Sequence, residues 1–401
     1  MLILALNAGS SSLKFGLFRA RSAGGVVQLM RGGFDGLSDE ARFSARDAGG
    51  TVLADRPLGS GDRSTQALLR ELLAFLDPLM NDEPLEAAGH RIVHGGSRFV
   101  APVRLTDEVL EALEALTPIA PLHQPASLGP VRALAALRPD LPQIGCFDTA
   151  FHSTLAPPAS RYAIPREYEE MGLRRYGFHG LSYAFIAERL GEISPALLKR
   201  KAVVAHLGAG CSLCAMMDGK SHDTTMGFTA LDGLMMATRS GAIDPGIILY
   251  LQQALGLSVK DVEQMLYRRS GLLGVSGISG DIRILLASDD PRAAGALDLF
   301  TFRIAAEVAR MASTLSGLEL LVFTGGVGEH AGRVREAICA RLEWLGVRID
   351  PAKSHGTISS ADSRVEVRII PTNEEMTIAR QAHAVIREAA SPNKRRSGEI
   401  R

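Results

Sequence analysis

The sequence predicts an α/β protein in which one strand–turn–strand unit occurs twice. Three observations support this prediction. Apolar runs of strand length are followed by glycine-rich turns, other segments carry apolar residues at helical spacing, and the segments that begin near residues 3 and 202 resemble each other. With 401 residues, the chain is long enough for two or three folded units.

The first third of the chain predicts a β-meander that is followed by helices. Strands are expected over residues 2–6, 13–18 and 26–30, with a polar turn over 7–12. Leucines recur on one face of residues 64–76 and 107–116, which predicts two helices. A short buried strand is expected over residues 143–147, and it ends at Asp148.

The second strand–turn–strand unit is expected over residues 201–217. This unit resembles the N-terminal segment when the two are compared, AVVAHLGAGCSLCAMM against ILALNAGSSSLKFGLF. Asp218-Gly219 predicts a hairpin turn after its second strand. The match indicates an internal duplication, although two similar glycine turns can also arise by chance.

Helices dominate the last third of the predicted structure. Ser258 and Asp261 have the spacing of a capping box. The remaining expectations are a helix over 296–315, a strand over 320–323, a glycine loop over 324–328, a helix over 332–345 closed by Gly346, a helix capped by Thr372 and Glu375 that reaches 388, and a disordered tail over 391–401.

Composition excludes several classes of protein. Lys plus Arg and Asp plus Glu each number 44, so the formal net charge is zero. The charge balance therefore does not favour a nucleic-acid or membrane partner. Four cysteines are too few for a disulfide scaffold and suit a reducing compartment. The longest apolar runs are far shorter than the ~20 residues that span a bilayer. The N-terminus lacks the features of a signal peptide, so we expect a cytoplasmic protein.

Three glycine turns that follow apolar strands, at residues 7–12, 208–212 and 325–328, suggest a polyphosphate ligand. Glycine lets backbone N–H groups approach a phosphate closely. Arg91 and Arg239 lie between glycines and apolar residues, where a guanidinium can bind an anion. Cys211 and Cys214 have zinc-like spacing but point to opposite faces of a strand. The spacing Gly326-x-Gly328-x-x-Ala331 leaves a nicotinamide-dependent dehydrogenase as an alternative.

Eleven motifs that occur in order along the chain make it resemble the acetokinase family, within the superfamily of sugar kinases, Hsp70 and actin. The motifs are ALNAGSSSLKF, HRIVHGG, PLHQP, FDTAFH, YGFHGLSY, HLGAG, TMGFTALDGLMMATRSG, DPG, SGISGDIR, FTGGVGEH and PTNEE. The resemblance implies two duplicated domains, residues 1–148 with 374–401 and residues 149–373. Each would hold a mixed five-stranded sheet flanked by helices, with the active site in the cleft between the domains.

The resemblance also assigns roles to individual residues. Asn7 and Glu374 match the magnesium site, and Ser10, Ser12 and Lys14 match the first phosphate hairpin. Asp148, His179, Arg239 and Arg91 match catalytic residues, and Arg91, Val93, Leu122, His123 and Phe178 match acetate-binding residues. The nucleotide segments correspond to His206, Gly208, Ala209, Gly210, Cys211, Ser212, Asp281, Ile282, Arg283, Gly325, Gly326, Val327, Gly328 and Glu329.

These residues imply a reversible, Mg²⁺-dependent transfer of the ATP γ-phosphoryl group to acetate, which gives acetyl phosphate and ADP in a homodimeric enzyme. Mn²⁺ is the alternative metal. A propionate kinase and an ATP-binding switch of the same superfamily remain alternative functions. Acetate is already ionised near pH 7, so Asp148 is expected to orient an arginine or metal-bound water rather than to accept a proton.

Four positions depart from the family pattern. Ala209 replaces an asparagine of the second phosphate turn, and Ala230 replaces a proline beside the acyl pocket. Ala242 replaces an aspartate after the arginine turn, and His330 replaces an asparagine after the third glycine turn. None of the four changes removes a residue that is assigned to phosphoryl transfer, but Ala230 makes the preference for acetate uncertain.

Overall fold

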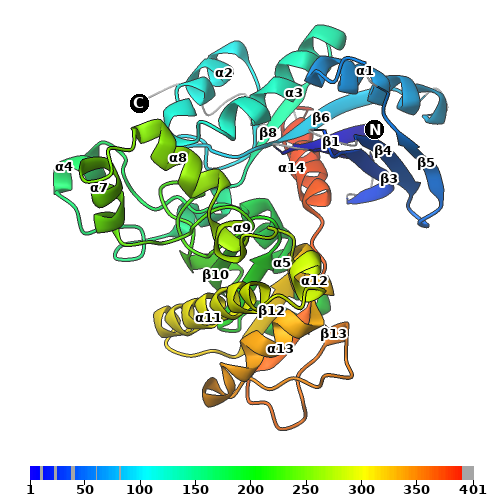
Figure 1. Ribbon diagram of the computed structural model, residues 1–401. Coiled ribbons are helices and arrows are strands. Elements are labelled where there is room, and N and C mark those ends of the chain that lie inside the picture. Colours follow the sequence, from blue (N-terminus) through cyan, green and yellow to red (C-terminus); the bar gives the residue numbers. More distant parts are fainter. Residues whose placement is uncertain (10–11, 22–24, 38–40, 60, 81–82, 391–401) are drawn as a thin grey trace, which may run out of the picture. The chain divides into compact units, whose positions relative to one another are not determined.

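The computed structural model describes residues 1–9, 12–21, 25–37, 41–59, 61–80 and 83–390 (Figure 1). The chain divides into two units, Met1–Ala150 with Asn373–Arg401 and Phe151–Thr372. Each unit is built around one mixed sheet with helices on its faces. The tail that is predicted to be disordered, residues 391–401, lies outside the described part of the chain.

The sheet of the first unit has eight strands in the order β5-β4-β3-β2-β1-β6-β8-β7. Strands β2, β3, β4 and β5 continue an antiparallel meander from β1, whereas β6 and β8 are parallel to β1. The strands are β1 (Leu2–Ala8), β2 (Leu13–Ala20), β3 (Val26–Asp35), β4 (Arg42–Asp47), β5 (Val52–Pro57), β6 (Leu85–Ile92), β7 (Val103–Arg104) and β8 (Gln143–Phe147).

The sheet of the second unit has six strands in the order β11-β10-β9-β12-β14-β13. Strands β11, β10 and β9 are antiparallel neighbours, and β12 and β14 run parallel to β9. The strands are β9 (Ala202–Leu207), β10 (Cys211–Met217), β11 (Lys220–Thr224), β12 (Leu320–Thr324), β13 (Gly356–Thr357) and β14 (Glu366–Ile369).

Five strands have the same order and directions in both sheets. The series β3-β2-β1-β6-β8 corresponds to β11-β10-β9-β12-β14. This repeated arrangement agrees with the two matching sequence segments. The prediction of five strands for each whole sheet was too low, because β4, β5, β7 and β13 extend the edges. Strand β5 is almost wholly exposed, so it lacks the apolar alternation that predicts a strand.

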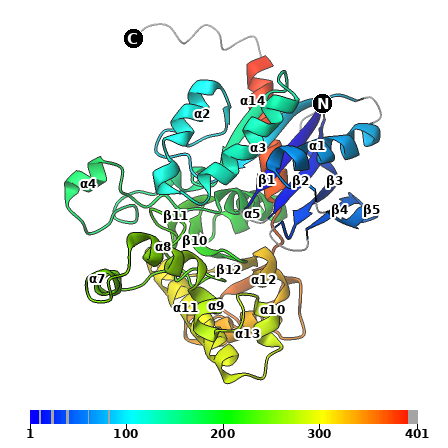
Figure 2. The same cartoon turned by 45° about the horizontal axis from the view of Figure 1, so that its top comes forward.

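Helices cover both faces of the first sheet. Leu2, Leu4 and Leu6 of β1 pack in one core with the leucines of α1, and α1 and α3 lie side by side (Figures 1 and 2). The alternate residue Ala5 pairs with Gly89, which lies against Ile378 of α14 on the opposite face. The helices are α1 (Thr65–Leu76), α2 (Asp107–Glu114), α3 (Gln124–Leu137) and α14 (Glu374–Ala390), with single 3₁₀ turns η1 (Asp77–Leu79) and η2 (Thr117–Ile119).

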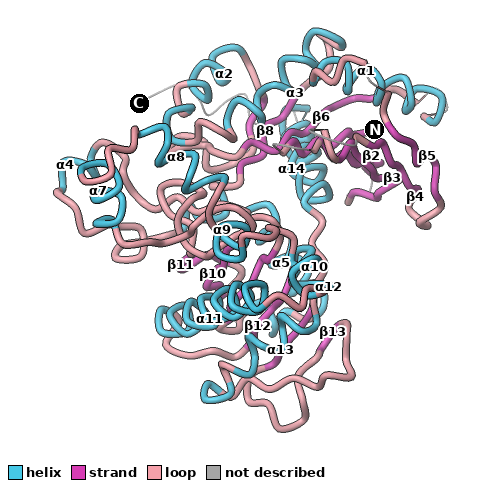
Figure 3. Tube along the Cα trace, viewed as in Figure 1, coloured by secondary structure: helices cyan, strands magenta, loops and turns pink. Residues whose placement is uncertain are grey.

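In the second unit, α5 packs on one face of the sheet with β9, β10 and β12, and the long helix α11 packs against β9, β10 and β11. A long irregular stretch separates β11 from α7 (Figure 3). The remaining elements are η3 (Ala150–Thr154), α4 (Arg166–Glu170), α5 (Gly180–Ile193), α6 (Pro195–Leu198), α7 (Pro245–Gln253), α8 (Val259–Arg268), α9 (Gly271–Ser276), α10 (Ile282–Leu286), α11 (Pro291–Thr314), α12 (Gly325–His330), α13 (Gly332–Ala340) and η4 (Glu343–Leu345).

Three expectations about the C-terminal third need correction. The glycine loop expected over 324–328 is instead the beginning of helix α12, which Gly325 enters with φ of 77°. The helix expected to reach 345 ends at Ala340 and is followed by a 3₁₀ turn before Gly346. The last helix is capped by Asn373 rather than Thr372, because Oδ1 of Asn373 accepts a hydrogen bond from the Met376 N–H at 2.9 Å. The capping box of Ser258 and Asp261 is confirmed at the start of α8.

Among the described helices, none combines the length and apolar character that crossing a membrane requires.

Candidate active site

The carboxyl ends of three adjacent strands bring Asn7, Arg91 and Asp148 together in the first unit. Asn7 lies near the end of β1, Arg91 near the end of β6, and Asp148 directly after β8. These strands are parallel neighbours, so their ends lie at one edge of the sheet, which is where α/β folds commonly bind ligands. Strand alternation also places Asn7 and Arg91 on the face that α14 covers, together with Ala5 and Gly89.

Arg91 is held in place by Asp148 and Asn7. Its Nη2 lies 2.6 Å from Oδ2 of Asp148, its Nε donates to the same carboxylate at 3.0 Å, and its Nη1 donates to Oδ1 of Asn7 at 3.1 Å. The side chain of Asp148 is 1% exposed. Burial alone would lower the pKa of Arg91, but the charges of Asp148 and Glu374 outweigh burial and raise it. The guanidinium therefore stays charged and fixed in orientation, as anion binding requires.

Two carboxylates converge on the amide of Asn7. Its Nδ2 donates to Oε2 of Glu374 at 2.9 Å and to Oε1 of Glu375 at 3.1 Å. Both glutamates begin α14, where the helix dipole stabilises negative charge. The structure thus brings together the two residues expected to hold magnesium. It adds Glu375, which sequence reasoning missed although it adjoins Glu374 in the same motif.

The residues present fit a magnesium ion. Glu374 and Glu375 supply the hard oxygen atoms that Mg²⁺ prefers, whereas Asn7 turns its amide nitrogen toward them and its oxygen toward Arg91. Within the described ranges, no group of three or more His, Cys, Asp or Glu residues is arranged to hold a metal. Magnesium commonly uses one or two protein carboxylates together with water and substrate phosphates, and Glu374 and Glu375 would provide that number.

The first phosphate hairpin lies beside this cluster. Lys14 of β2 pairs in register with Asn7 of β1, and its side chain is exposed. Ser12 is half-buried, and its carbonyl oxygen accepts a hydrogen bond from the Gly9 N–H at 2.8 Å, which closes the turn. Ser10, expected to contact phosphate, lies outside the described residues.

Gln124 and Ser127 hold the segment that follows β6 against helix α3. Oε1 of Gln124 accepts from the His94 N–H at 3.2 Å, and the Ser127 hydroxyl accepts from the Val93 N–H at 3.3 Å. Val93 is buried, and the half-buried Leu122 and His123 directly precede Gln124. Three residues expected to bind acetate are therefore anchored to one junction, while Phe178 lies in the second unit, next to His179.

In the second unit, a chain of hydrogen bonds orients His179. Its backbone has a left-handed conformation with φ of 58°, which turns the residue at the start of α5. Nδ1 of His179 lies 2.8 Å from the Ser212 hydroxyl, which lies 2.5 Å from the Tyr183 hydroxyl. The imidazole rings of His179 and His206 stack with centroids 4.3 Å apart, and Nδ1 of His206 lies 2.9 Å from the Ser182 hydroxyl.

The direction of these hydrogen bonds determines which ring nitrogen of His179 carries the proton. Burial raises the pKa of Tyr183 well above its usual value, so its hydroxyl stays protonated. Among the described residues, the Ser212 hydroxyl is the hydrogen-bond partner of that hydroxyl. Tyr183 therefore donates to Ser212, Ser212 donates to Nδ1 of His179, and the imidazole proton resides on Nε2. The Nε2–H group becomes a donor that faces Gly210.

His179 and Arg239 both face the glycine turn between β9 and β10. A Cβ atom built on Gly210 would lie 3.3 Å from Nε2 of His179 and 4.0 Å from Nη1 of Arg239. Nη1 of Arg239 also donates to the Ala230 carbonyl at 3.1 Å. A side chain at position 210 would crowd Nε2 of His179 and would lie in van der Waals contact with Arg239.

A pocket of about 570 Å³ lies beside the same turn. It brings together segments of the chain that were expected to bind nucleotide, although they are far apart in sequence. The lining residues are Gly208, Ala209, Gly280, Asp281, Ile282, Arg283, Leu286, Gly326, Val327, His330 and Ala331. Its volume lies in the range of small-ligand sites. His330 lines this pocket at a position that departs from the family pattern.

Other residues expected to bind nucleotide have different contacts. Oε1 of Glu329 accepts from the Gly325 N–H at 2.9 Å and from the Thr372 N–H at 3.2 Å, so this carboxylate stabilises the start of α12. Cys211 is buried, and burial raises the pKa of its thiol to about 12. Several residues that were expected to bind nucleotide do not line this pocket, namely Cys211, Ser212, Gly325, Gly328 and Glu329.

Comparison with known proteins decides the family. Residues 2–380 match the sequence pattern of the Acetokinase family. The chain belongs to the acetokinase family. The acetate kinase of Rhodopseudomonas palustris is 48% identical over 385 residues, which cover 94% of this chain and 96% of that protein. The acetate kinase of Nitrobacter hamburgensis is 44% identical over 398 residues and 98% of each chain.

Solved structures of acetokinases agree with this fold. The propionate kinase of Francisella tularensis has a TM-score of 0.87 and 38% identity, and covers 96% of this chain and 99% of its own. The acetate kinase of Porphyromonas gingivalis has a TM-score of 0.82 and 35% identity over the same shares of the two chains. Membership of the acetokinase family confirms the resemblance that the ordered motifs indicate.

The dehydrogenase alternative is wrong for this acetokinase. Gly326, Gly328 and Ala331 belong to α12 and its end. A dinucleotide-binding unit needs a strand after this helix, but the described chain has none between α13 and Asp350. Val347 and Ile349 form only isolated bridges. The glycine spacing therefore arises from a helix that lines the pocket of about 570 Å³.

Proposed function

We propose that this acetokinase transfers the γ-phosphoryl group of ATP reversibly to acetate, which gives acetyl phosphate and ADP. One observation supports the proposal most directly. The turn whose residues Gly208 and Ala209 line the large pocket also faces the donors of His179 and Arg239 at Gly210. A nucleotide in this pocket would direct its phosphates toward those donors.

The chemistry requires charge neutralisation more than covalent help from the protein. A carboxylate oxygen of acetate forms a bond to the γ-phosphorus while the bond from that phosphorus to the β–γ bridging oxygen breaks, and ADP leaves. Both reactants are anions, so positioning and electrostatic stabilisation supply most of the rate enhancement. In this proposal Arg91 binds the acetate carboxylate, and Arg239 and the Nε2–H group of His179 stabilise the charge on the phosphoryl oxygens.

Asp148 acts through Arg91 in this proposal. Acetate needs no general base near pH 7. The buried Asp148 carboxylate accepts two hydrogen bonds from the Arg91 guanidinium and so fixes its orientation. Asn7 and Glu374, with Glu375 beside them, would hold Mg²⁺ or Mn²⁺. When bound, the metal neutralises phosphate charge.

The acyl group is proposed to contact Val93, Leu122 and Phe178, with His123 nearby. Ala230 stands where the family pattern has proline, and its side chain is nearly buried. A smaller residue here would relax the limit on acyl length. We therefore propose acetate as the main substrate and propionate as a second one, which also agrees with the structural similarity to a propionate kinase.

We further propose that the enzyme is a cytoplasmic homodimer. Helix α7 supports the dimer, since it has no buried residue although Ile247, Leu249 and Tyr250 are 48%, 53% and 60% exposed. A helix this apolar is normally covered by another surface. The four buried, unpaired cysteine thiols agree with a reducing compartment.

Trapping the acyl phosphate as a hydroxamate with hydroxylamine tests the function. The protein is incubated with ATP, Mg²⁺ and acetate, propionate or butyrate, and the Arg239→Ala variant serves as the control. We expect hydroxamate from acetate, less from propionate and little from butyrate. Absence of hydroxamate from all three acids would refute the proposed activity.

A further inference from the structure

His152 is a buried histidine that has no part in the reaction proposed above. It belongs to η3, near the start of the second unit, and is 2% exposed. Its Nε2 lies 3.0 Å from the Phe178 carbonyl oxygen, and its Nδ1 lies 2.8 Å from the Ser221 hydroxyl. Both ring nitrogens are therefore bonded to segments far from His152 in sequence, and one of these segments leads directly into His179.

The two partners determine which nitrogen of His152 carries the proton. A carbonyl oxygen can only accept, so the Nε2–H group donates to Phe178. Burial lowers the pKa of His152 from 6.5 to about 4, so the imidazole is neutral near pH 7 and Nδ1 accepts from the Ser221 hydroxyl. Ser221 is anchored in turn, because the Thr154 hydroxyl donates to its carbonyl at 2.7 Å. The imidazole is thus a fixed donor for the backbone next to His179.

The backbone on both sides of Phe178 has a conformation that needs support. Gly177 and His179 have positive φ angles of 75° and 58°, and the second is unfavourable because His179 has a Cβ atom. A Cβ atom on Gly177 would lie 2.5 Å from Cδ2 of His152, so the imidazole packs directly against this turn. A residue in such a conformation persists only when its surroundings hold it there. The bond to the Phe178 carbonyl and the packed ring supply this restraint.

His152 also contacts the hydrogen-bonded residues that orient the side chain of His179. Its ring meets the ring of Tyr183 edge to face, with centroids 5.5 Å apart. The Tyr183 hydroxyl lies 2.5 Å from that of Ser212, which is bonded to Nδ1 of His179. His152 therefore supports His179 through its backbone and through its side chain.

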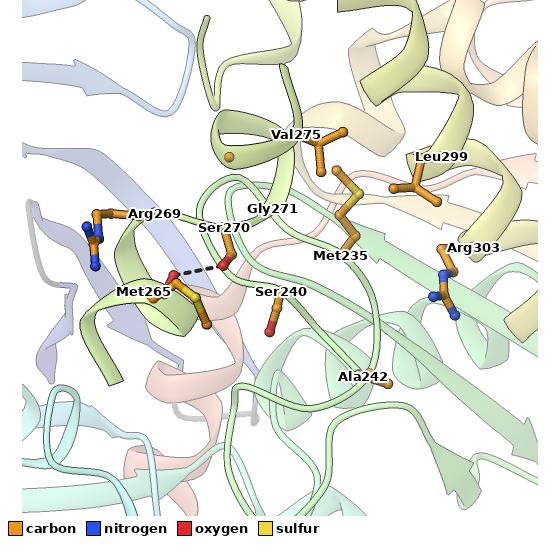
Figure 4. Close-up of a pocket in the computed structure, with 12 residues that line it drawn as sticks. Met235, Ser240, Ala242, Met265, Arg269, Ser270, Gly271, Val275, Leu299 and Arg303 are labelled. Atoms are coloured by element: carbon orange, nitrogen blue, oxygen red, sulfur yellow. Dashed lines mark hydrogen bonds between the residues drawn. The ribbon is translucent and has the colours of Figure 1, made fainter. Parts of the chain in front are cut away.

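Arg239, the other donor assigned to the phosphoryl group, has a separate support. Its turn is bonded to the segment between α8 and α9, where the Ser270 N–H donates to the Thr238 carbonyl at 3.0 Å. The Ser270 hydroxyl donates to the Met265 carbonyl at 2.8 Å (Figure 4). His152 takes part in neither bond, so replacing it should leave Arg239 in place.

We propose that His152 is a positioning residue for His179, because its Nε2–H group holds the Phe178 carbonyl and so keeps the His179 imidazole directed at Gly210. This role rests on the proposed part of His179 in phosphoryl transfer. The hydrogen bond itself lies within the second unit and requires no ligand.

Two substitutions separate the bond to Phe178 from the packing of the ring. A glutamine amide nitrogen can take the place of Nε2, whereas an asparagine amide nitrogen reaches only the place of Nδ1. Both variants lose the ring, and only His152→Gln keeps a donor for the carbonyl. We expect kcat to be about 10-fold lower in His152→Asn than in His152→Gln, with the KM for ATP unchanged in both. His222→Asn is the matched control and should keep the wild-type kcat, because His222 adjoins Ser221 on β11 but belongs to none of these bonds.

Proton–nitrogen correlation NMR of protein labelled at histidine gives a second measurement that requires no turnover. The signals of His179 are assigned by their absence from His179→Ala. We expect the pattern of an Nε2–H imidazole in the wild type, in His222→Asn and in His152→Gln, and a mixture of the two protonation forms in His152→Asn. Ser221→Ala is a milder second variant, since it keeps the ring but removes the donor to Nδ1, and it should shift the pattern in the same direction.

The proposal is overturned if neither His152→Asn nor Ser221→Ala alters the His179 pattern. It is also overturned if His152→Asn and His152→Gln lower kcat equally, because the ring and not the donor would then be what matters. Since the spectra are recorded without substrates, a failure to form acyl phosphate would refute the proposed function and leave this test valid.

Discussion

The Ser212 hydroxyl lies 2.8 Å from Nδ1 of His179, and the two residues come from a strand and from the start of a helix on one face of the second sheet. Ser212 pairs in register with His206 on β9, so the two histidines stack beside it. Because Tyr183 donates to Ser212, the serine is left to donate to His179. This chain of three side chains keeps the His179 proton on the nitrogen that faces Gly210.

Replacing Tyr183 by phenylalanine should therefore lower kcat without changing the KM for acetate. The variant keeps the ring but removes the donor that directs Ser212, so His179 no longer favours the Nε2–H form. We expect a loss of about 10-fold, in the range found for residues that orient a functional group. Steady-state kinetics measures it.

A double variant separates positioning from a packing effect. In the His179→Ala background, Tyr183→Phe should have no further effect on kcat. An undiminished effect in that background would show that Tyr183 does not act through His179.

Arg91→Ala and Arg239→Ala should each reduce kcat about 10³-fold, because each removes a cation from phosphoryl transfer. They should differ in stability. Arg91→Ala leaves the carboxylate of Asp148 buried without its partner, which typically costs about 3–5 kcal/mol. Thermal unfolding should show a lower midpoint for Arg91→Ala than for Arg239→Ala. Near-wild-type turnover in either variant would contradict the assignment.

Glu374→Gln should raise the Mg²⁺ concentration that gives half-maximal activity about 10-fold, because a charged oxygen ligand becomes neutral. Glu375→Gln is the matched comparison, since its carboxylate also accepts from Nδ2 of Asn7. We expect a smaller shift there. If the magnesium titration of Glu374→Gln coincides with that of the wild type, the role of Glu374 is only to stabilise the N-terminus of α14 through the helix dipole.

Ala230→Pro should lower the preference for propionate relative to acetate. Alanine leaves room for one more methylene, whose burial gains about 0.8 kcal/mol. The Ala230 carbonyl accepts from Arg239, and proline retains that carbonyl, so the arginine contact should survive. The ratio of kcat/KM for the two acids measures the effect. An unchanged ratio would indicate that residue 230 does not limit the acyl group.

Stability should fall as the pH drops from about 6.5 toward 4. Burial lowers the pKa of His152 from 6.5 to about 4, so the unfolded chain binds this proton first and stability decreases with falling pH. His90 and His94 have pKa values of about 4 for the same reason. His152→Asn should make the decline of the unfolding midpoint over this range less steep. An equally steep decline in the variant would argue against the contribution of His152.

Local patterns predicted the elements that carry strong periodicity or a cap. The strand over 143–147 matches β8, and the capping box of Ser258 and Asp261 begins α8 as predicted. Helix α12 escaped prediction because its glycines have low helix propensity. Its start is stabilised by the carboxylate of Glu329, a contact that no local pattern reveals.

The sequence by itself determined the family, the repeated strand–turn–strand unit and the residue types available for phosphoryl transfer, because ordered motifs and apolar periodicity are properties of the chain alone. Only the tertiary structure decided which side chains meet. Glu375 reaches Asn7, and Tyr183 reaches Ser212. The physical reason is that these contacts depend on the pairing of distant strands and on which face of the sheet each helix covers. Both are settled by packing over the whole unit.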